Sequence, residues 1–317
     1  MRIATAVFLA ASAAACLVEA AGSEQPPAAL DEIVVTAERA GPGMWHVHRD
    51  AANVWLLGSI SPLPRDITWR SKQVESVLES ASQVLVQKPI EISLPRILWM
   101  LIADRKVLMV GGGKKLNDVL PPELHARFAA QRSKVTDDKD KWERYRPIIA
   151  AAFLQQAAFH QVNLSMRLDL GAALRILAKK HGVRVEEIKV AGVSDMLEAL
   201  KTMPAATEHT CVAASLSTVE SGLPRLVDRA QAWASGNVER IEGMPELKEV
   251  DACRNALDVG KGAVDVIGRI RQTWVENIER YLRSAGTTIA VVNLDLLLER
   301  GGLLDQLRAK GYEIDAP

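Results

Sequence analysis

The chain has no net charge, because its 39 lysines and arginines balance 39 aspartates and glutamates over 317 residues. No basic stripe stands out either, and proteins that bind nucleic acid need clustered positive charge. We therefore expect no nucleic-acid partner. Hydrophobic residues make up 48% and charged residues 25% of the chain. This composition is typical of a globular protein and is enough for one large domain or two small ones.

The apolar run near the N-terminus is too short to span a membrane comfortably. It covers residues 3–17 after Met1 and Arg2, and an Ala-x-Ala-like sequence follows around Ala20. This pattern predicts a secretory signal peptide over residues 1–21, and therefore an exported, periplasmic protein with no transmembrane span in its mature chain. Lipoprotein anchoring through Cys16 is the less favoured alternative. Residues 22–43 indicate a flexible tether, followed by a single domain over residues 44–317.

Cysteine is scarce, and two of the three cysteines, Cys211 and Cys253, lie beyond the predicted signal peptide. An even number of cysteines in an exported protein favours a disulfide. The bond would close a loop of 42 residues and stabilise the fold by roughly 4 kcal/mol. Two buried free thiols are the alternative, because the sequence does not show whether the two Cα atoms approach each other.

Strand patterns lie towards the two ends of the chain, and helical patterns fill its middle. Extended runs are predicted at residues 44–49, 53–60, 83–87, 184–189, 287–292 and 312–314. Helices are predicted at residues 71–80, after Pro121 and at Pro147, with long helical tracts over residues 207–235 and 248–285. We therefore expect an α/β (α+β) fold with a central mixed β-sheet formed from N- and C-terminal strands and a large helical middle segment.

A histidine is absent from a motif in which it would be expected. The run from Val54 through Gly58-Ser59-Ile60-Ser61 to Pro62-Leu63-Pro64 resembles the signature of the TraB/GumN family, relatives of the Tiki metalloproteases. In that signature a strand ends in Gly-Ser/Thr-x-His, followed by a Leu-Pro pair. The resemblance extends over roughly residues 44–314. It includes a Trp-x-x-Gly turn at Trp233 and, as its most specific match, a closing helix and strand at residues 302–312.

The resemblance implies a divalent metal site in active relatives, formed by two Gly-x-x-His motifs and the acidic end of an inner strand. The corresponding positions here are Ser61, Gln87 and Leu296, and a one-residue shift would place Asp295 at the last of them. An imidazole or carboxylate binds such an ion, whereas a lone serine hydroxyl is a poor ligand. The resemblance therefore implies a site that has lost its metal, and we expect no cofactor.

Two interpretations of function follow from these substitutions. The first is a pseudoenzyme that binds a peptide or protein partner in the former active-site cleft, at Gly58, Ser59, Ser61 and Asn293. The alternative is a divergent hydrolase or protease with a rebuilt site that uses Ser61 or Asp295. A nucleophilic serine needs a base within hydrogen-bond reach, and the sequence neither identifies one nor contains the Gly-x-Ser-x-Gly elbow.

His46 and His48 form a His-x-His pair on a predicted strand, and this spacing places both imidazoles on one face. The pair could form a separate metal site. With only Asp50 close by in the sequence, we favour the interpretation that Trp45 and Val47 pack inward while the two histidines lie on a solvated face. The other four histidines, at positions 125, 160, 181 and 209, have no second ligand at helical spacing.

Overall fold

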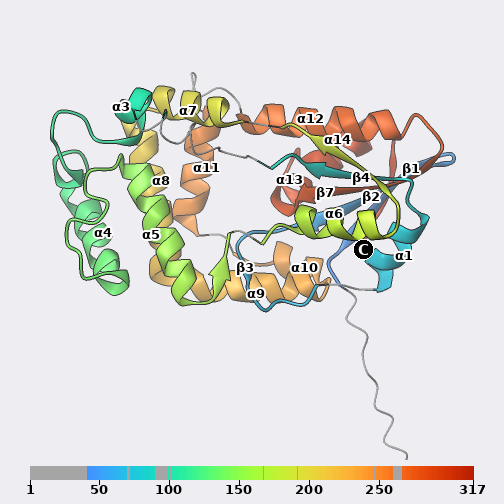
Figure 1. The fold of residues 1–317 in the computed structure, drawn as a ribbon, viewed down its shortest axis with the longest axis horizontal. Coiled ribbons are helices and arrows are strands. Elements are labelled where there is room, and N and C mark those ends of the chain that lie inside the picture. Colours follow the sequence, from blue (N-terminus) through green and yellow to red (C-terminus); the bar gives the residue numbers. More distant parts are fainter. Residues whose placement is uncertain are drawn as a thin grey trace, which may run out of the picture. The chain divides into compact units, whose positions relative to one another are not determined.

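A six-stranded mixed sheet carries the main hydrophobic core of the computed structural model (Figure 1). The order of its strands is β6-β4-β7-β2-β1-β8. Their bounds are β1 (Met44–Arg49), β2 (Ala52–Ser59), β4 (Gln83–Gln87), β6 (Arg184–Ile188), β7 (Gly286–Asn293) and β8 (Glu313–Asp315). The sheet thus combines strands from both ends of the chain, which confirms the predicted fold class.

The structure describes residues 41–69, 72–89, 99, 102–166, 168–190, 192–245, 247–259 and 266–317. The predicted signal peptide at residues 1–21, Cys16 within it and most of the predicted tether at residues 22–43 lie outside these ranges. None of the helices in the described ranges is both long enough and apolar enough to cross a membrane.

The sheet is parallel on one side and antiparallel on the other. Strand β7 pairs in parallel with β2 and β4, and β4 pairs in parallel with β6. Strand β1 pairs antiparallel with both β2 and β8. The β1–β2 hairpin turns at Asp50, whose φ of 52° is left-handed, a conformation that aspartate tolerates better than most residues. Five consecutive buried residues in β7 identify it as a central strand that is covered on both faces.

Helices cover both faces of the sheet. Helix α6 (Leu170–Lys180) packs on β4 and β6, and α1 (Lys72–Ser80) packs on β7. Helix α12 (Val266–Tyr281) contacts β2 and β7, and α14 (Leu303–Ala309) contacts α12. Figure 1 shows α12 and α14 on one side of the sheet and α1 and α6 on the other. Apolar residues of both layers meet in the core, which includes Leu56, Val84, Leu174, Trp274 and Ile289.

The helical middle segment has a smaller core of its own. It is built from α4 (Pro122–Val135), α5 (Pro147–Gln161) and α8 (Ala205–Ser217), which contact one another. Pro122 and Pro147 occupy the first turns of α4 and α5, as predicted. The N–H that proline lacks would have no partner within the helix at this position. Phe128, Leu154 and Val212 are among the residues buried between these helices.

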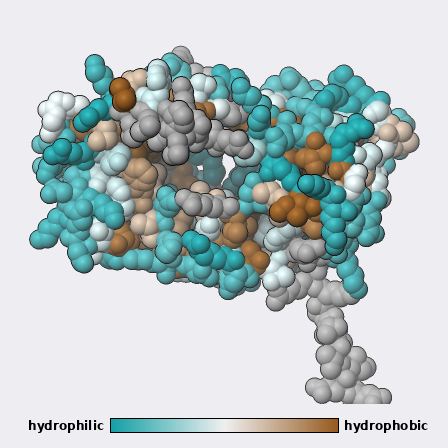
Figure 2. Space-filling view, in the orientation of Figure 1, coloured by the Kyte–Doolittle hydropathy of each residue, from teal (hydrophilic) through white to brown (hydrophobic). Residues whose placement is uncertain are grey.

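The described residues also form two short strands and further helices. They are β3 (Leu63–Pro64), which pairs with β5 (Leu164–Ser165), and α3 (Arg105–Leu108), α7 (Val193–Thr202), α9 (Leu223–Ala234), α10 (Val238–Glu242), α11 (Lys248–Val259) and α13 (Leu294–Leu298). Hydrophilic side chains cover most of the face seen in Figure 2, where hydrophobic ones form separate patches.

The tract predicted as one helix over residues 207–235 differs in its middle. Helix α8 continues into a π-helical segment, η2 (Thr218–Gly222), before α9 begins. A π-helical turn contains one residue more than an α-helical turn, and the helical periodicity of the sequence does not reveal it. Such π-helical segments are rare and are often found at functional sites.

A disulfide joins Cys211 on α8 to Cys253 on α11, with 4.7 Å between the two Cα atoms. The predicted bond is therefore confirmed, and the alternative of two free thiols is wrong. Cys211 is buried. The bond attaches α11 to the helical core.

Candidate functional site

The parallel pairing of β2 and β7 brings two of the predicted site positions together. Ser59 at the end of β2 lies opposite Asn293 at the end of β7. Because the carboxyl ends of parallel strands share one edge of a sheet, the residues that follow them emerge side by side. Ser61 and Asp295 both line a single pocket of about 580 Å³ at this edge. This is where α/β folds commonly place their ligand sites.

The Gly58 motif is held by contacts that leave no room for a side chain. A Cβ atom at Gly58 would lie 2.7 Å from Cδ1 of Leu294 and 3.1 Å from the ring of Trp45. The indole N–H of the buried Trp233 donates a hydrogen bond to the Gly58 carbonyl at 2.7 Å. The Ser59 hydroxyl donates to the Val292 carbonyl at 3.2 Å. Gly58 and Ser59 thus fix the strand ends rather than line the pocket.

The remaining predicted positions lie outside the pocket lining. The side-chain oxygen of Asn293 caps α13 by accepting hydrogen bonds from the N–H groups of Asp295, at 2.8 Å, and Leu296, at 3.3 Å. Leu296 itself is half-buried and packs against the main core. Gln87 is exposed at the end of β4, and its carbonyl accepts a hydrogen bond of 2.7 Å from Arg175. The structure therefore brings together Ser61 and Asp295, but not Gln87, Leu296 or Asn293.

The donor groups in the pocket do not fit a divalent metal. The Ser61 hydroxyl is neutral, and its hydrogen bond is a weak one to the sulfur of Met166 at 3.5 Å. The Asp295 carboxylate is paired with the guanidinium of Arg229. No histidine or cysteine is among the described residues that line the pocket. Of the three carboxylates among the described lining residues, Asp295 and Glu299 are already engaged by arginines. What remains is a weak basis for binding zinc, which normally has three or four N, S or O ligands from the protein.

The helical middle segment supplies most of the pocket wall. Helix α9 and the π-helical segment before it contribute Gly222, Arg225, Leu226 and Arg229. These four residues are spaced at i, i+3, i+4 and i+7, which places them on one helix face. Sequence reasoning missed them, although this spacing and the two arginines could have identified the face. Phe159 on α5, Met244 and Leu298 are among the apolar residues that complete the wall.

Most of the charges in the pocket are already paired, but Arg225 has no acidic partner among the described residues. Glu299 accepts a hydrogen bond of 2.9 Å from Nε of Arg271, and Asp295 is held by Arg229. Arg225 donates to the Met244 carbonyl at 3.4 Å, and no carboxylate of the described residues lies within ion-pair distance of its guanidinium. This half-buried arginine can therefore receive an anionic group from a ligand.

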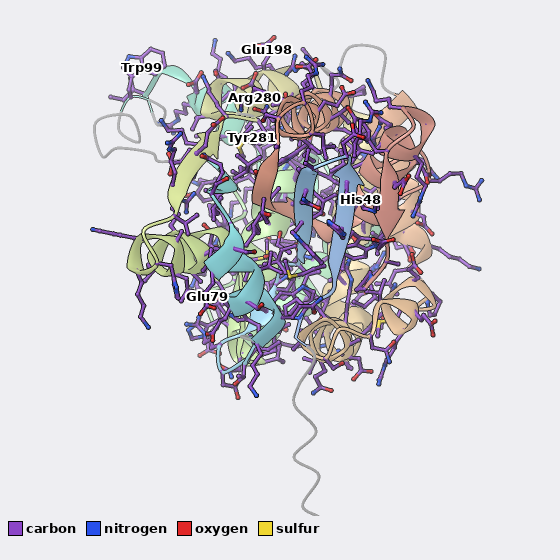
Figure 3. The ribbon with its side chains drawn as sticks, turned by 90° about the vertical axis from the view of Figure 1, so that its right-hand side faces the viewer. His48, Glu79, Trp99, Glu198, Arg280 and Tyr281 are labelled. Atoms are coloured by element: carbon purple, nitrogen blue, oxygen red, sulfur yellow. A yellow bond between two sulfur atoms is a disulfide. The ribbon has the colours of Figure 1, made fainter. Side chains whose placement is uncertain are left out.

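A group of pKa changes occurs away from the pocket, at Glu186 on β6 and at Arg280 and Tyr281. Arg280 and Tyr281 are neighbours at the end of α12 (Figure 3). Burial opposes ionisation of Glu186, but hydrogen bonds from Tyr281 and Arg280 outweigh it and lower the pKa of this carboxyl. Burial, together with the hydrogen bond to Glu186, raises the pKa of Tyr281 to about 12. These groups attach β6 to α12, so their shifts reflect a structural cluster.

His46 and His48 lie on one face of β1 and do not line the pocket. Trp45 and Val47 are buried on the opposite face, as predicted. The expected neighbour, Asp50, lies in the hairpin turn, and the acidic group beside the two imidazoles is instead Asp315 on β8. The sequence could not indicate this neighbour, because 269 residues separate it from His46.

Comparison with known proteins supports the family resemblance. No curated protein and no solved structure matches the chain. The family model of the TraB/PrgY/gumN family does match, over residues 43–316. This range contains the Gly58 motif, the pocket and the closing helix and strand. The predicted resemblance is thereby confirmed, and the chain belongs to the TraB/PrgY/gumN family.

Proposed function

We propose that this protein is a non-catalytic member of its family that binds a peptide, or an extended segment of a partner protein, in the pocket beside Ser61 and Asp295. The observation that carries the proposal is the composition of this pocket. At the edge of the sheet where family relatives are expected to hold a metal, the described lining residues include many apolar side chains, three arginines and three carboxylates, of which Asp295 and Glu299 are paired with arginines. Such a lining is suited to binding rather than to metal-assisted hydrolysis.

The chemistry of the lining indicates the kind of segment that would bind. Phe159, Leu226 and Met244 offer apolar surface for an aliphatic or aromatic side chain. The guanidinium of Arg225, which has no acidic partner among the described residues, offers two parallel donors to a carboxylate, which guanidinium groups bind with favourable geometry. We therefore propose a ligand with an apolar side chain close to a carboxylate, at a free C-terminus or on an acidic residue.

The competing hypothesis, a hydrolase rebuilt around Ser61 or Asp295, receives less support from the geometry. The contact that Ser61 makes through its hydroxyl is to a thioether, which cannot act as a general base. The carboxylate of Asp295 is already held by the guanidinium of Arg229. Turnover of a peptide by the purified protein would contradict the proposal directly.

A library of decapeptides, synthesised with either free or amidated C-termini, tests the proposal. Peptides retained by the protein are titrated by fluorescence anisotropy against the wild type and Arg225→Ala. We expect Arg225→Ala to weaken binding by about 10-fold to 100-fold, because a hydrogen bond to a charged group contributes roughly 1.5–3 kcal/mol. Ser61→Ala should weaken binding less.

The matched control is Arg283→Ala, which removes an exposed arginine that does not line the pocket. Its affinity should equal that of the wild type, and circular dichroism should show that all variants fold. Equal binding by Arg225→Ala and the wild type would refute the assignment of the pocket. Mass spectrometry of the peptides after incubation, with and without manganese, cobalt or zinc, should show no cleavage.

We also propose that the protein is exported to an oxidising compartment. The support is the basic and apolar N-terminal sequence together with the disulfide between Cys211 and Cys253, a bond that rarely persists in the cytosol. Cell fractionation followed by N-terminal sequencing tests this: a mature protein beginning near residue 21 is expected, and an intact Met1 in the cytosolic fraction would contradict it.

A further inference from the structure

Strand pairing gathers polar side chains from three neighbouring strands on one face of the sheet. Residues directly opposite each other in antiparallel strands project from the same face. The residues opposite His46 are Asp315 on β8 and Trp55 on β2, and those opposite His48 are Glu313 on β8 and Asn53 on β2. The two histidines therefore lie between two acidic residues and two residues that can orient them.

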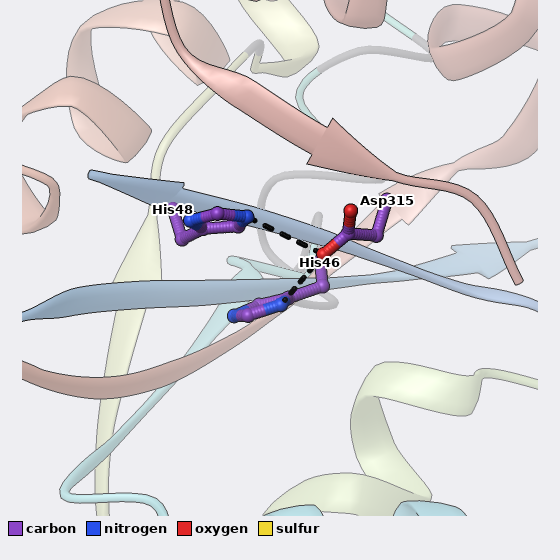
Figure 4. Close-up of side chains that lie close together, drawn as sticks. All are labelled: His46, His48 and Asp315. Carbon is purple, nitrogen blue, oxygen red and sulfur yellow. Dashed lines mark hydrogen bonds and ion pairs between the residues drawn. The ribbon is translucent and has the colours of Figure 1, made fainter. Parts of the chain in front are cut away.

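The two imidazoles converge on one carboxylate oxygen. Nδ1 of His46 and Nε2 of His48 each lie 3.3 Å from Oδ2 of Asp315, as Figure 4 shows. One ligand atom from each of the three residues lies within 4.8 Å of the other two. Both histidine side chains are about a quarter exposed, while that of Asp315 is 67% exposed. The cluster is thus open to solvent on one side and rests on the sheet on the other.

A hydrogen bond that His46 donates to Asn53 determines which nitrogen of His46 is available. Nε2 of His46 lies 2.8 Å from the side-chain oxygen of Asn53, and the amide nitrogen of Asn53 donates to the Ala51 carbonyl at 3.3 Å. Because an amide oxygen can only accept, Nε2 must carry a hydrogen. In the neutral ring the lone pair is then on Nδ1, directed at Asp315. A lone pair and a carboxylate that face each other are stabilised by a cation between them, either a proton or a metal ion.

We propose that His46, His48 and Asp315 bind one divalent transition metal ion, with zinc as the favoured ion. Two imidazole nitrogens and one carboxylate oxygen form a donor set that zinc commonly adopts, at about 2.0–2.2 Å from each ligand. Because Asp315 is exposed at the end of β8, its carboxylate can shift outward to admit the ion. Glu313, whose carboxylate is 3.8 Å from Nε2 of His48, or a water molecule can complete the coordination.

The surroundings of the cluster resemble the outer shell of a metal site. Metal-bound histidines usually donate their second ring N–H to an oxygen that fixes the ring, and Asn53 does this for His46. Trp55 stacks on His46 with 4.3 Å between ring centroids and an interplanar angle of 11°, which restricts the ring further. The ion would join β8 to β1 across a pairing of only three residues, and so would stabilise the edge of the sheet.

Isothermal titration of zinc chloride into the untagged full chain, after dialysis against a chelator, tests this site. The wild type should bind one zinc ion. His46→Ala/His48→Ala should weaken the binding by at least about 100-fold, because two of three protein ligands are lost. Asp315→Asn should weaken it by about 10-fold or more. The matched control, His160→Ala/His181→Ala, removes two exposed histidines outside the cluster and should leave the affinity unchanged.

Three results would overturn the proposal. They are no zinc binding by the wild type, equal affinity in the wild type and His46→Ala/His48→Ala, and equal affinity in the wild type and Asp315→Asn. Since Asp315 is exposed at the end of the chain's last strand, Asp315→Asn keeps the test decisive even if the β1 variant does not fold. None of these variants touches the pocket beside Ser61, so the outcome is independent of peptide binding.

Discussion

Removal of the disulfide tests how strongly the helical middle segment depends on a covalent link. Cys211 and Cys253 are 42 residues apart in the sequence, and the loop-entropy relation for that separation gives a stabilisation of about 4 kcal/mol. Domains are typically stable by only about 5–15 kcal/mol, so this contribution is a large fraction of the total. We therefore expect Cys211→Ala/Cys253→Ala to fold with much reduced stability.

The expected shift in melting temperature follows from the size of the domain. With an unfolding entropy of about 2.1 cal/mol/K per residue, a loss of about 4 kcal/mol lowers the Tm of a domain of about 275 residues by roughly 7 °C. Urea denaturation should show a lower midpoint. It should also show a larger m-value, because the denatured chain without the bond exposes more surface.

Reduced wild-type protein is the control, because it loses the bond without any change of side chain. It should melt close to the double alanine variant. Because Val250 and Arg254 on α11 line the pocket, loosening α11 should also weaken peptide binding. The reasoning is refuted if reduction shifts the Tm by less than about 1 °C, or if thiol titration of the native mature protein finds two free thiols.

Two further substitutions test the buried and partly buried ion pairs. The guanidinium of Arg146 is paired with the buried carboxylate of Glu208 at 2.9 Å. Glu208→Gln removes this partner and should lower the free energy of unfolding, measured by urea denaturation, by about 3 kcal/mol. The control Glu198→Gln, at an exposed site, should lower it by less than about 0.5 kcal/mol. Tyr281→Phe removes a hydrogen bond that helps lower the pKa of Glu186. A carboxyl whose pKa is lower in the folded than in the unfolded protein stabilises the fold at pH values above its pKa in the unfolded protein. This stabilisation is lost as the pH falls through its pKa in the folded protein. The variant should therefore be less stable by under about 1 kcal/mol at pH 7 and should approach the wild type in acid; a difference independent of pH would contradict this origin.

The pocket and the histidine cluster are two separate sites on the same sheet. The pocket lies at the carboxyl edge of β2 and β7, where the Gly58 motif ends. The cluster lies on the β1 and β8 side, where the pairing is antiparallel. If zinc binds the cluster, the protein holds a metal at a place different from the one that its family resemblance implies. Because the two sites share no residue, each can be tested without disturbing the other.

Local patterns in the sequence were sufficient to predict the elements of the fold. The strands at residues 44–49 and 83–87 and the helix starts at Pro122 and Pro147 were predicted closely. These features depend on side-chain periodicity and on the backbone limits of proline, which act over a few residues. The Gly58 motif and the closing helix also indicated the family, because they are short continuous segments.

Only the tertiary structure decided which of the predicted site residues meet. Ser61 and Asp295 share a pocket because β2 and β7 pair in parallel, whereas Gln87 and Leu296 lie elsewhere. The arginines of α9 contribute to the pocket wall, and Asp315 contacts His46 across 269 residues of sequence. Such neighbours are set by strand pairing and helix packing between distant segments, and no local periodicity encodes them. The sequence by itself determined most of the helices and strands and showed Ser61 in place of the motif histidine. The packing of those elements determined the sites.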